Sequence, residues 1–253
     1  MKLIINADDF GLSKSVTDGI IDGIKAGVIT STSIMANMEF ADYAIKQAVK
    51  NDIKCVGLHI NLTVGRPLTD CPSLCDGSGK FLYIDKQSVN NKADTKEIYN
   101  EIMAQANFVE SRELELTHLD VHHPAIKNAP LFRSAIFRIC REKNLPIRKK
   151  HSTETWRGET PKDIASADAF SEEFFGKDSC GGFLEALKDI FARYRNTERV
   201  VEIMSHAGYV DDYTKKITAY SQRETELETL MKFKKDGGFD GIEMISFKAL
   251  KKF

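Results

Sequence analysis

Side chains that bind metals or move protons follow several short apolar runs of this sequence. They are Asp8 and Asp9 after LIINA, His59 after KCVGL, His118, Asp120, His122 and His123 in and after LTHLDV, and His206 after VVEIMS. In a barrel of alternating strands and helices, the carboxyl ends of the strands meet at one mouth, where catalysis takes place. Because five of the six histidines lie at such ends, the pattern predicts a metal-dependent hydrolase.

The adjacent carboxylates Asp8 and Asp9 could take two different roles in one site. Neighbours on a strand point to opposite faces, but both can reach one pocket where the chain turns at a strand end. One carboxylate would bind the metal, and the other would take a proton from water. The structural alternative is that Asp9 or Ser13 caps the helix that follows.

His118, Asp120 and His122 alternate along one expected strand. Alternate residues share a face, and a polar row inside a barrel is costly unless its members are paired or bind a metal. His122, nearest the carboxyl end, is the expected ligand, whereas His118 and Asp120 are expected to lie deeper and orient the ligands. His123 faces away from this row and is expected at the rim of the site or on the ordinary surface.

Three further residues each have more than one interpretation. His59 is either a metal ligand or a hydrogen-bonded core histidine, and His206 is a fourth ligand, a general acid or a structural residue. Arg148 ends the short run PIR. It would hold a carboxylate in place or bind an anionic group of the substrate, unless it belongs to a solvated basic patch with Lys149 and Lys150.

Two histidines and one carboxylate with open positions form a catalytic metal arrangement. On ligand softness, nitrogen donors favour zinc, cobalt, nickel or manganese over magnesium. The pair Cys71 and Cys75 lacks the second pair that a zinc knuckle needs. The single tryptophan, Trp156, lies in an expected insertion, where it could stack on a sugar ring.

Bulk properties limit the class of protein. The chain has 253 residues, 42% of them hydrophobic, and a formal net charge of -1. We expect a single domain over residues 1–253, with no electrostatic basis for binding nucleic acid or an anionic membrane. The short apolar start, the absence of a run of about 18 apolar residues and the five irregularly spaced cysteines favour a cytoplasmic protein with reduced thiols.

Strands and helices are expected to alternate. The expected strands cover residues 3–7, 31–36, 55–60, 117–121, 145–148, 200–205 and 241–245, and the expected helices cover 15–26, 40–50, 95–110, 130–143, 183–194 and 223–235. Residues 61–85 and 151–180 are expected to be loop-like insertions. This order predicts an α/β fold, a distorted TIM-like barrel with about seven parallel strands, and an open doubly wound sheet is the alternative. Phosphate-binding glycine motifs are absent from the sequence.

Several motifs, taken in order, give the chain a recognisable pattern. NADDFGLS, TSTSIMAN, GLHINLTVGRPL, THLDVHHP, PIR, EIMSHAGY and YSQRETEL run from the amino terminus to the last third of the chain. In this order and spacing they resemble the YdjC-like carbohydrate deacetylases, a family that includes the chitooligosaccharide deacetylases.

The resemblance implies a barrel-like α/β fold, a divalent metal and removal of acetyl groups from N-acetylated sugars, which are often phosphorylated disaccharides. By motif position it implies Asp9, His59 and His122 as metal ligands, Asp8 as catalytic base and His206 as general acid. The family is usually described with magnesium, so the metal stays open between magnesium and zinc. The sequence departs from the family where His123 is followed by Pro124, and where His206-Ala207-Gly208 replaces the usual His-Pro-Gly.

The expected activity is therefore release of acetate from chitobiose or its 6-phosphate. Two alternatives remain at the sequence level: a metal-dependent phosphoester or glycoside hydrolase at the same site, and a non-catalytic sugar-binding protein. The expected partner is a small N-acetylated sugar. A homodimer is compatible with the sequence, with the two insertions as contacts, but nothing in the pattern demands it.

Overall fold

The computed structural model describes residues 1–123, 129–149 and 160–251. Its seven strands are β1 (Lys2–Phe10), β2 (Ser31–Ile34), β3 (Val56–Ile60), β4 (Leu119–Val121), β5 (Ala169–Ser171), β6 (Val200–Ser205) and β7 (Glu243–Met244). The longer helices are α1 (Lys14–Lys25), α2 (Ala41–Lys50), α4 (Thr95–Glu110), α5 (Pro130–Lys143), α6 (Cys180–Tyr194) and α8 (Arg223–Lys235). Shorter turns of helix are η1 (Pro72–Leu74), α3 (Ile84–Gln87), α7 (Asp212–Ile217) and η3 (Phe247–Leu250).

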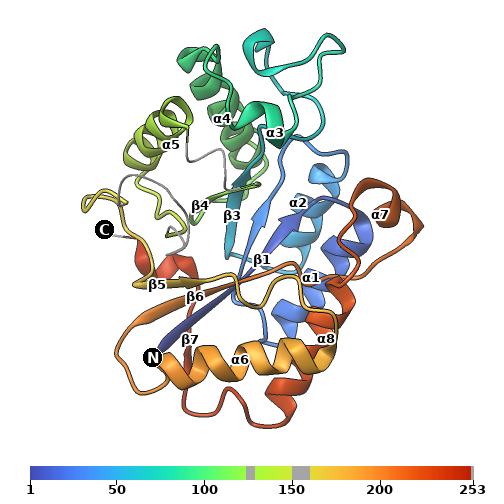
Figure 1. Cartoon of the computed structure of the whole chain (residues 1–253), viewed down its shortest axis with the longest axis vertical. Helices are drawn as coiled ribbons and strands as arrows, with labels where there is room; N and C mark the ends of the chain where they lie inside the picture. Colours follow the sequence, from blue (N-terminus) through green and yellow to red (C-terminus); the bar gives the residue numbers. More distant parts are fainter. Residues whose placement is uncertain (124–128, 150–159, 252–253) are drawn as a thin grey trace.

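The sheet has the strand order of a barrel opened at one place. The order is β4-β3-β2-β1-β6-β5, all neighbours are parallel, and β7 pairs with the start of β1. Read around a circle, the first six strands follow one another in chain order, with the break between β4 and β5. A doubly wound sheet would instead reverse direction near its middle. The predicted barrel-like α/β fold is confirmed, as a parallel sheet curled into a half-barrel with flanking helices (Figure 1).

Helices α1 and α4 begin at a capping side chain, and apolar residues recur along them at helical spacing. In α1, Ser13 accepts a hydrogen bond from the backbone N–H of Val16, and Val16, Ile20 and Ile21 are buried. In α4, Asp94 caps the backbone N–H groups of Lys96 and Glu97. The helices flank the curled sheet (Figure 1), and the apolar residues of α1 and α4 belong to the hydrophobic core.

The long segment between β3 and α4 is fixed by a buried carboxylate. Glu101 of α4 accepts hydrogen bonds from the backbone N–H groups of Leu68 and Thr69 and from the Thr69 hydroxyl, at 2.7–3.1 Å. Thr63 Oγ1 also lies 2.9 Å from His123 Nδ1. The segment therefore borders the carboxyl ends of the strands.

Two expectations from the sequence need correction. Residues 151–180 are not wholly irregular, because β5 lies within this range and pairs with β6. Residues 145–148 form only one isolated bridge, in which Ile147 pairs with Leu119. Helix α7 was not expected. Trp156 and part of the second insertion lie outside the described residues.

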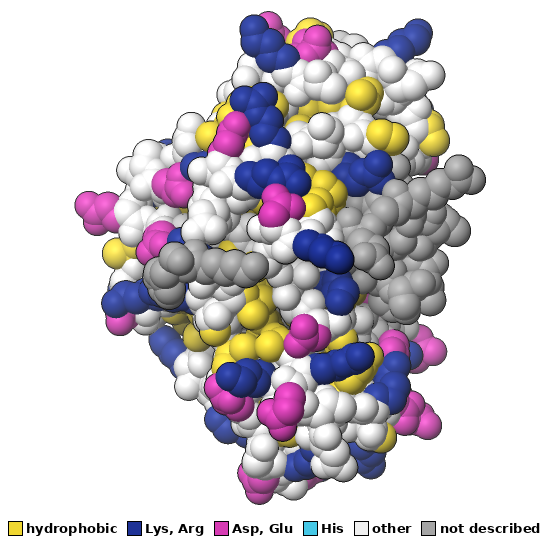
Figure 2. All heavy atoms as spheres, turned by 90° about the vertical axis from the view of Figure 1, so that its left-hand side faces the viewer, with side chains coloured by type: hydrophobic (Ala, Val, Ile, Leu, Met, Phe, Trp, Pro, Cys, Tyr) yellow, Lys and Arg dark blue, Asp and Glu magenta, His cyan; other side chains and the backbone are white. Residues whose placement is uncertain are grey.

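The surface carries both signs of charge. On the face around α5, Lys and Arg side chains are interspersed with Asp and Glu (Figure 2), as expected for a chain of net charge -1. Within the described ranges, every helix is too short or too polar to cross a membrane.

Candidate active site

The two adjacent aspartates reach one cavity because β1 is distorted there. The register between β1 and β2 shifts between Ala7 and Phe10, and Asp9 has a positive φ of 68°. A shift of this kind re-aims the side chains on a strand, and aspartate is among the residues that tolerate a left-handed backbone. The expected turn at a strand end is thus a distortion within β1, since the strand continues to Phe10.

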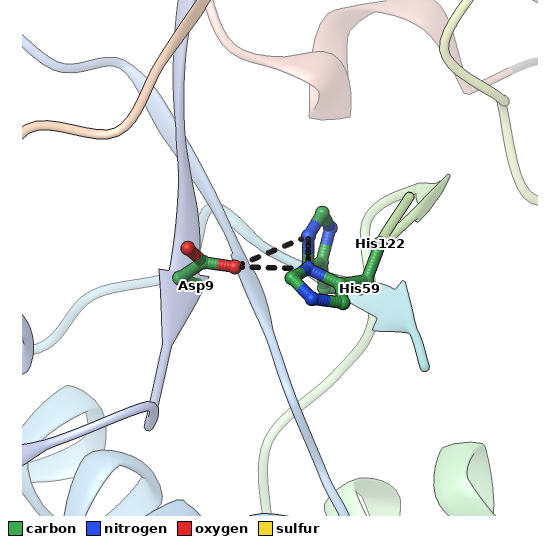
Figure 3. A group of neighbouring side chains, drawn as sticks. All are labelled: Asp9, His59 and His122. Carbon is green, nitrogen blue, oxygen red and sulfur yellow. Dashed lines mark hydrogen bonds and ion pairs between the residues drawn. The ribbon is translucent and has the colours of Figure 1, made fainter. Parts of the chain in front are cut away.

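Asp9, His59 and His122 point toward one another from β1, β3 and the end of β4 (Figure 3). Asp9 Oδ1 lies 3.4 Å from His59 Nε2 and 3.3 Å from His122 Nδ1. The two imidazole nitrogens are 3.3 Å apart. The three atoms therefore form a nearly equilateral triangle.

This triangle has the dimensions of one face of a metal coordination sphere. Ligands about 2.1 Å from an ion lie about 3.0–3.4 Å apart when they are at right or tetrahedral angles to one another. Asp9 Oδ1 is buried and, among the described residues, accepts no well-formed hydrogen bond. A buried carboxylate oxygen without such a donor is costly unless a cation meets it. The residues present fit a divalent metal, and they do not select its identity.

Asp120 fixes the orientation of His59. His59 Nδ1 donates to Asp120 Oδ1 at 2.8 Å, which leaves Nε2 directed at Asp9 and His122. The other oxygen of Asp120 accepts from Ser33 Oγ at 2.7 Å and from Asn6 Nδ2 at 3.2 Å. A carboxylate behind a ligating histidine sets its tautomer and raises its basicity.

Asp8 is held by Arg148. The guanidinium donates to both carboxylate oxygens of Asp8, at 2.7 and 2.6 Å, and Asn6 Nδ2 donates to Asp8 Oδ1 at 2.8 Å. Arg148 also contacts Asp120 at 3.1 Å and Glu202 at 2.7 Å. Of the two roles expected for Arg148, this geometry corresponds to holding a carboxylate, because the guanidinium is buried among three of them.

The field of these carboxylates favours a positive charge at the triangle. Burial alone would lower the pKa of His59, yet Asp120 and Asp8 raise it to about 10. Burial alone would raise the pKa of Asp9, but the Arg223 guanidinium, 2.6 Å from Oδ2, and the two histidines bring it well below its usual value. Asp9 therefore stays ionised, and the environment that stabilises a proton on His59 also favours a metal cation.

His206 lies in a separate, less polar part of the site. Its Nδ1 is buried and without a partner among the described residues, and burial lowers the pKa of the ring to about 4. Its backbone N–H donates to buried Glu226 at 2.6 Å. The imidazole is therefore neutral near pH 7.

His118 and His123 lie on opposite sides of the triangle. His118 is buried below it, stacks on Phe247 at 3.9 Å and contacts Thr117 Oγ1 at 3.0 Å. In the described structure it has no hydrogen bond to a member of the triangle. His123 packs beside His122 at 4.1 Å and lines the cavity.

Several polar residues of the site were not expected from the sequence. Glu202 had a visible signal, since it is the only charged residue within the apolar run VVEIMS. Arg223 begins α8, and nothing in its local sequence separates it from the other basic residues of a helix. Only the tertiary fold brings it to Asp9.

These groups surround a cavity of about 260 Å³ at the carboxyl ends of the strands. Its lining combines ionisable residues, namely Asp8, Asp9, histidines and arginines, with the apolar side chains of Val121, Phe170, Phe175 and Met204. Such a cavity can orient a small polar molecule against a metal and a base.

Comparison with known proteins identifies the family of the chain. The model of the YdjC-like protein family matches residues 2–234. The chain belongs to the YdjC-like family. It is 36% identical to a carbohydrate deacetylase of Brevibacillus brevis, over 91% of each chain. It is 32% identical to a carbohydrate deacetylase of Oceanobacillus iheyensis, over 91% of this chain and 96% of that one. The predicted family and the predicted class of enzyme, a carbohydrate deacetylase, are confirmed.

Solved structures extend the comparison. A crystal structure from Enterococcus faecalis, described as that of a candidate cellobiose-phosphate cleavage protein, has a TM-score of 0.86 and 27% identity to this YdjC-like chain, with 99% of each covered. A family 4 acetyl xylan esterase from Clostridium thermocellum has a TM-score of 0.53 and 8% identity, over 99% of this chain and 90% of that one. The second likeness shows a shared fold alone.

Proposed function

We propose that this YdjC-like protein removes acetyl groups from small N-acetylated sugars, with one divalent metal held by Asp9, His59 and His122. The triangle of ligand atoms beside the Asp8–Arg148 pair is the observation that supports this most. A divalent cation at that position would polarise the acetyl carbonyl and make nearby water more acidic. The names of the curated relatives supply the substrate class.

Asp8 is the proposed base. Its carboxylate lines the same cavity as the triangle, and Arg148 and Asn6 orient it. Asp8 would take a proton from the attacking water and return it to the departing sugar amine. Because His206 is neutral at rest, any proton that it delivers must first reach it during the reaction, so we assign it the secondary role in protonating the amine.

The test is acetate release from N,N′-diacetylchitobiose and its 6-phosphate by chelated protein, with magnesium or zinc added back. Asp8→Asn should lower turnover roughly 10²- to 10⁴-fold, the usual contribution of a general base, while metal binding persists. Glu202→Gln is the matched control. It changes the same Arg148 network behind Asp8, but Glu202 does not line the cavity, so the loss should be much smaller.

Other products would identify another reaction. The Enterococcus faecalis protein of related structure is described in terms of cellobiose-phosphate cleavage, so phosphate and reducing ends should be measured in the same samples. Phosphate or reducing-sugar release without acetate would overturn the proposed deacetylation. Normal acetate release by Asp8→Asn would overturn the assignment of the base.

A further inference from the structure

Phe175, Tyr220 and His206 form an aromatic wall beside the triangle of Asp9, His59 and His122, and the proposed deacetylation gives no role to Phe175 or Tyr220. Phe175 lies 4.7 Å from both the His206 and Tyr220 rings, measured between ring centroids, and all three residues line the cavity. Phe175 is 43% exposed, whereas the adjacent Phe174 is fully buried against Phe183. Of the described phenylalanines, Phe175 alone presents so much of its ring to solvent.

Buried hydrogen bonds hold this wall in place. The Tyr220 hydroxyl donates to Glu226 Oε1, and the backbone N–H of Gly176, next to Phe175, donates to the Tyr220 hydroxyl at 3.4 Å. The second oxygen of Glu226 accepts from Ser205 Oγ at 2.7 Å and from the backbone of His206. One buried carboxylate thus fixes the Tyr220 ring and the His206 backbone, so the wall exists before a ligand arrives.

The wall is continuous with the proposed metal site. Arg223 donates to Asp9 Oδ2 at 2.6 Å, and its guanidinium also lies 5.7 Å from the centre of the Tyr220 ring. Arg223 therefore lies between a molecule on the wall and Asp9, the proposed metal ligand. Phe175 is exposed at the rim, whereas Asp9 is buried, so the wall extends outward from the reacting position.

We propose that Phe175 and Tyr220 form a subsite for a second pyranose ring, the ring joined to the N-acetylated sugar that reacts. This inference rests on the proposed function. A pyranose has an apolar C–H face that can cover an exposed aromatic ring and a polar edge for hydrogen bonds. Thr218, Glu172 and Lys149 line the same cavity, so polar residues are present for the hydroxyl groups of a second ring. The subsite would give the enzyme a preference for disaccharides over single sugars.

Kinetics with two sugars test the subsite. Phe175→Ala should raise KM for N,N′-diacetylchitobiose about 10-fold with kcat nearly unchanged, because a stacking contact away from the reacting atoms acts on ground state and transition state alike. KM for N-acetylglucosamine should not change, and Phe175→Trp should keep the disaccharide preference. Tyr209→Ala is the control, since Tyr209 is a similarly exposed aromatic residue, at 39%, outside the cavity lining.

Binding separates this inference from the proposed reaction. N,N′-diacetylchitobiose is titrated by NMR into Asp8→Asn protein with and without Phe175→Ala. Binding that weakens with Phe175→Ala, but not with Tyr209→Ala, supports the subsite even if the enzyme releases no acetate. Unchanged disaccharide binding and KM in Phe175→Ala, or an equal effect on N-acetylglucosamine, would overturn the assignment of a second-ring subsite while leaving deacetylation intact.

Discussion

Asp120→Asn gives a direct test of how the proposed metal site is built. Asp120 accepts from His59 Nδ1 on one oxygen, and from Ser33, Arg148 and Asn6 on the other, at 2.7–3.2 Å. An asparagine must place its single carbonyl oxygen toward the three donors, because its NH₂ group would otherwise oppose all of them. Its NH₂ group then faces His59 Nδ1, which must become an acceptor.

The substitution is expected to change the tautomer of His59. With Nδ1 accepting, the proton of neutral His59 moves to Nε2, the atom that faces Asp9 at 3.4 Å, where it blocks coordination. Replacing the carboxylate behind a metal-binding histidine typically lowers metal affinity 10- to 100-fold, about 1.4–2.8 kcal/mol.

A second effect of this substitution opposes the first. Asp120 is the leading cause of the raised pKa of His59. Its loss therefore also lowers the affinity of His59 for the proton that competes with the metal. A divalent cation has twice the charge of a proton and loses more from the missing carboxylate. The net result is therefore weaker metal binding, with a shallower dependence of affinity on pH.

Isothermal titration of chelated protein with zinc and with magnesium measures this effect. Glu101→Gln serves as the matched control, because Glu101 is an equally buried carboxylate that anchors Leu68 and Thr69 rather than a histidine. Metal affinity should fall in Asp120→Asn and stay unchanged in Glu101→Gln. Equal affinity in Asp120→Asn and the wild type, in folded protein, would refute the proposed orientation of His59.

Two further predictions concern the layer beneath the triangle. Burial lowers the pKa of His118 to about 4, so between pH 6.5 and 4 the unfolded chain binds a proton there that the folded chain does not. Stability should therefore fall as pH falls, by up to about 3 kcal/mol from this residue, and urea unfolding at several pH values should show less of this loss in His118→Phe. In Gly57→Ala the new Cβ would lie 2.4 Å from the His118 ring, which is stacked on Phe247. Unfolding in urea should show about 1–3 kcal/mol of destabilisation, partly relieved by adding His118→Ala; no destabilisation would show that the ring moves freely.

Strong local patterns predicted much of the fold. Helix α5 at Pro130–Lys143, helix α8 at Arg223–Lys235 and strand β6 at Val200–Ser205 have the expected bounds, because each has apolar residues at clear spacing. Strand β5 is only three residues long and is defined by its pairing with β6. Local sequence contains no information about such a partner, so the strand was missed.

The site likewise contains residues that the sequence predicted and contacts that only the tertiary fold reveals. The grouping of Asp9, His59 and His122 followed from strand ends and the family resemblance, and the structure places their ligand atoms together. The contacts of Arg148 could not be decided from PIR alone, since its three carboxylate partners come from β1, β4 and β6. The link from Arg223 to Asp9 spans more than 200 positions of sequence and likewise depends on the tertiary fold.

The central claim is that one divalent metal, bound by Asp9, His59 and His122, supports deacetylation. The most direct test titrates chelated protein with metal, and measures bound metal per chain and acetate release from N,N′-diacetylchitobiose in the same samples. Acetate release should rise in proportion to occupancy and level off at one ion per chain, and His122→Ala should lose both together. Full acetate release by metal-free protein, or by His122→Ala without bound metal, would contradict the account.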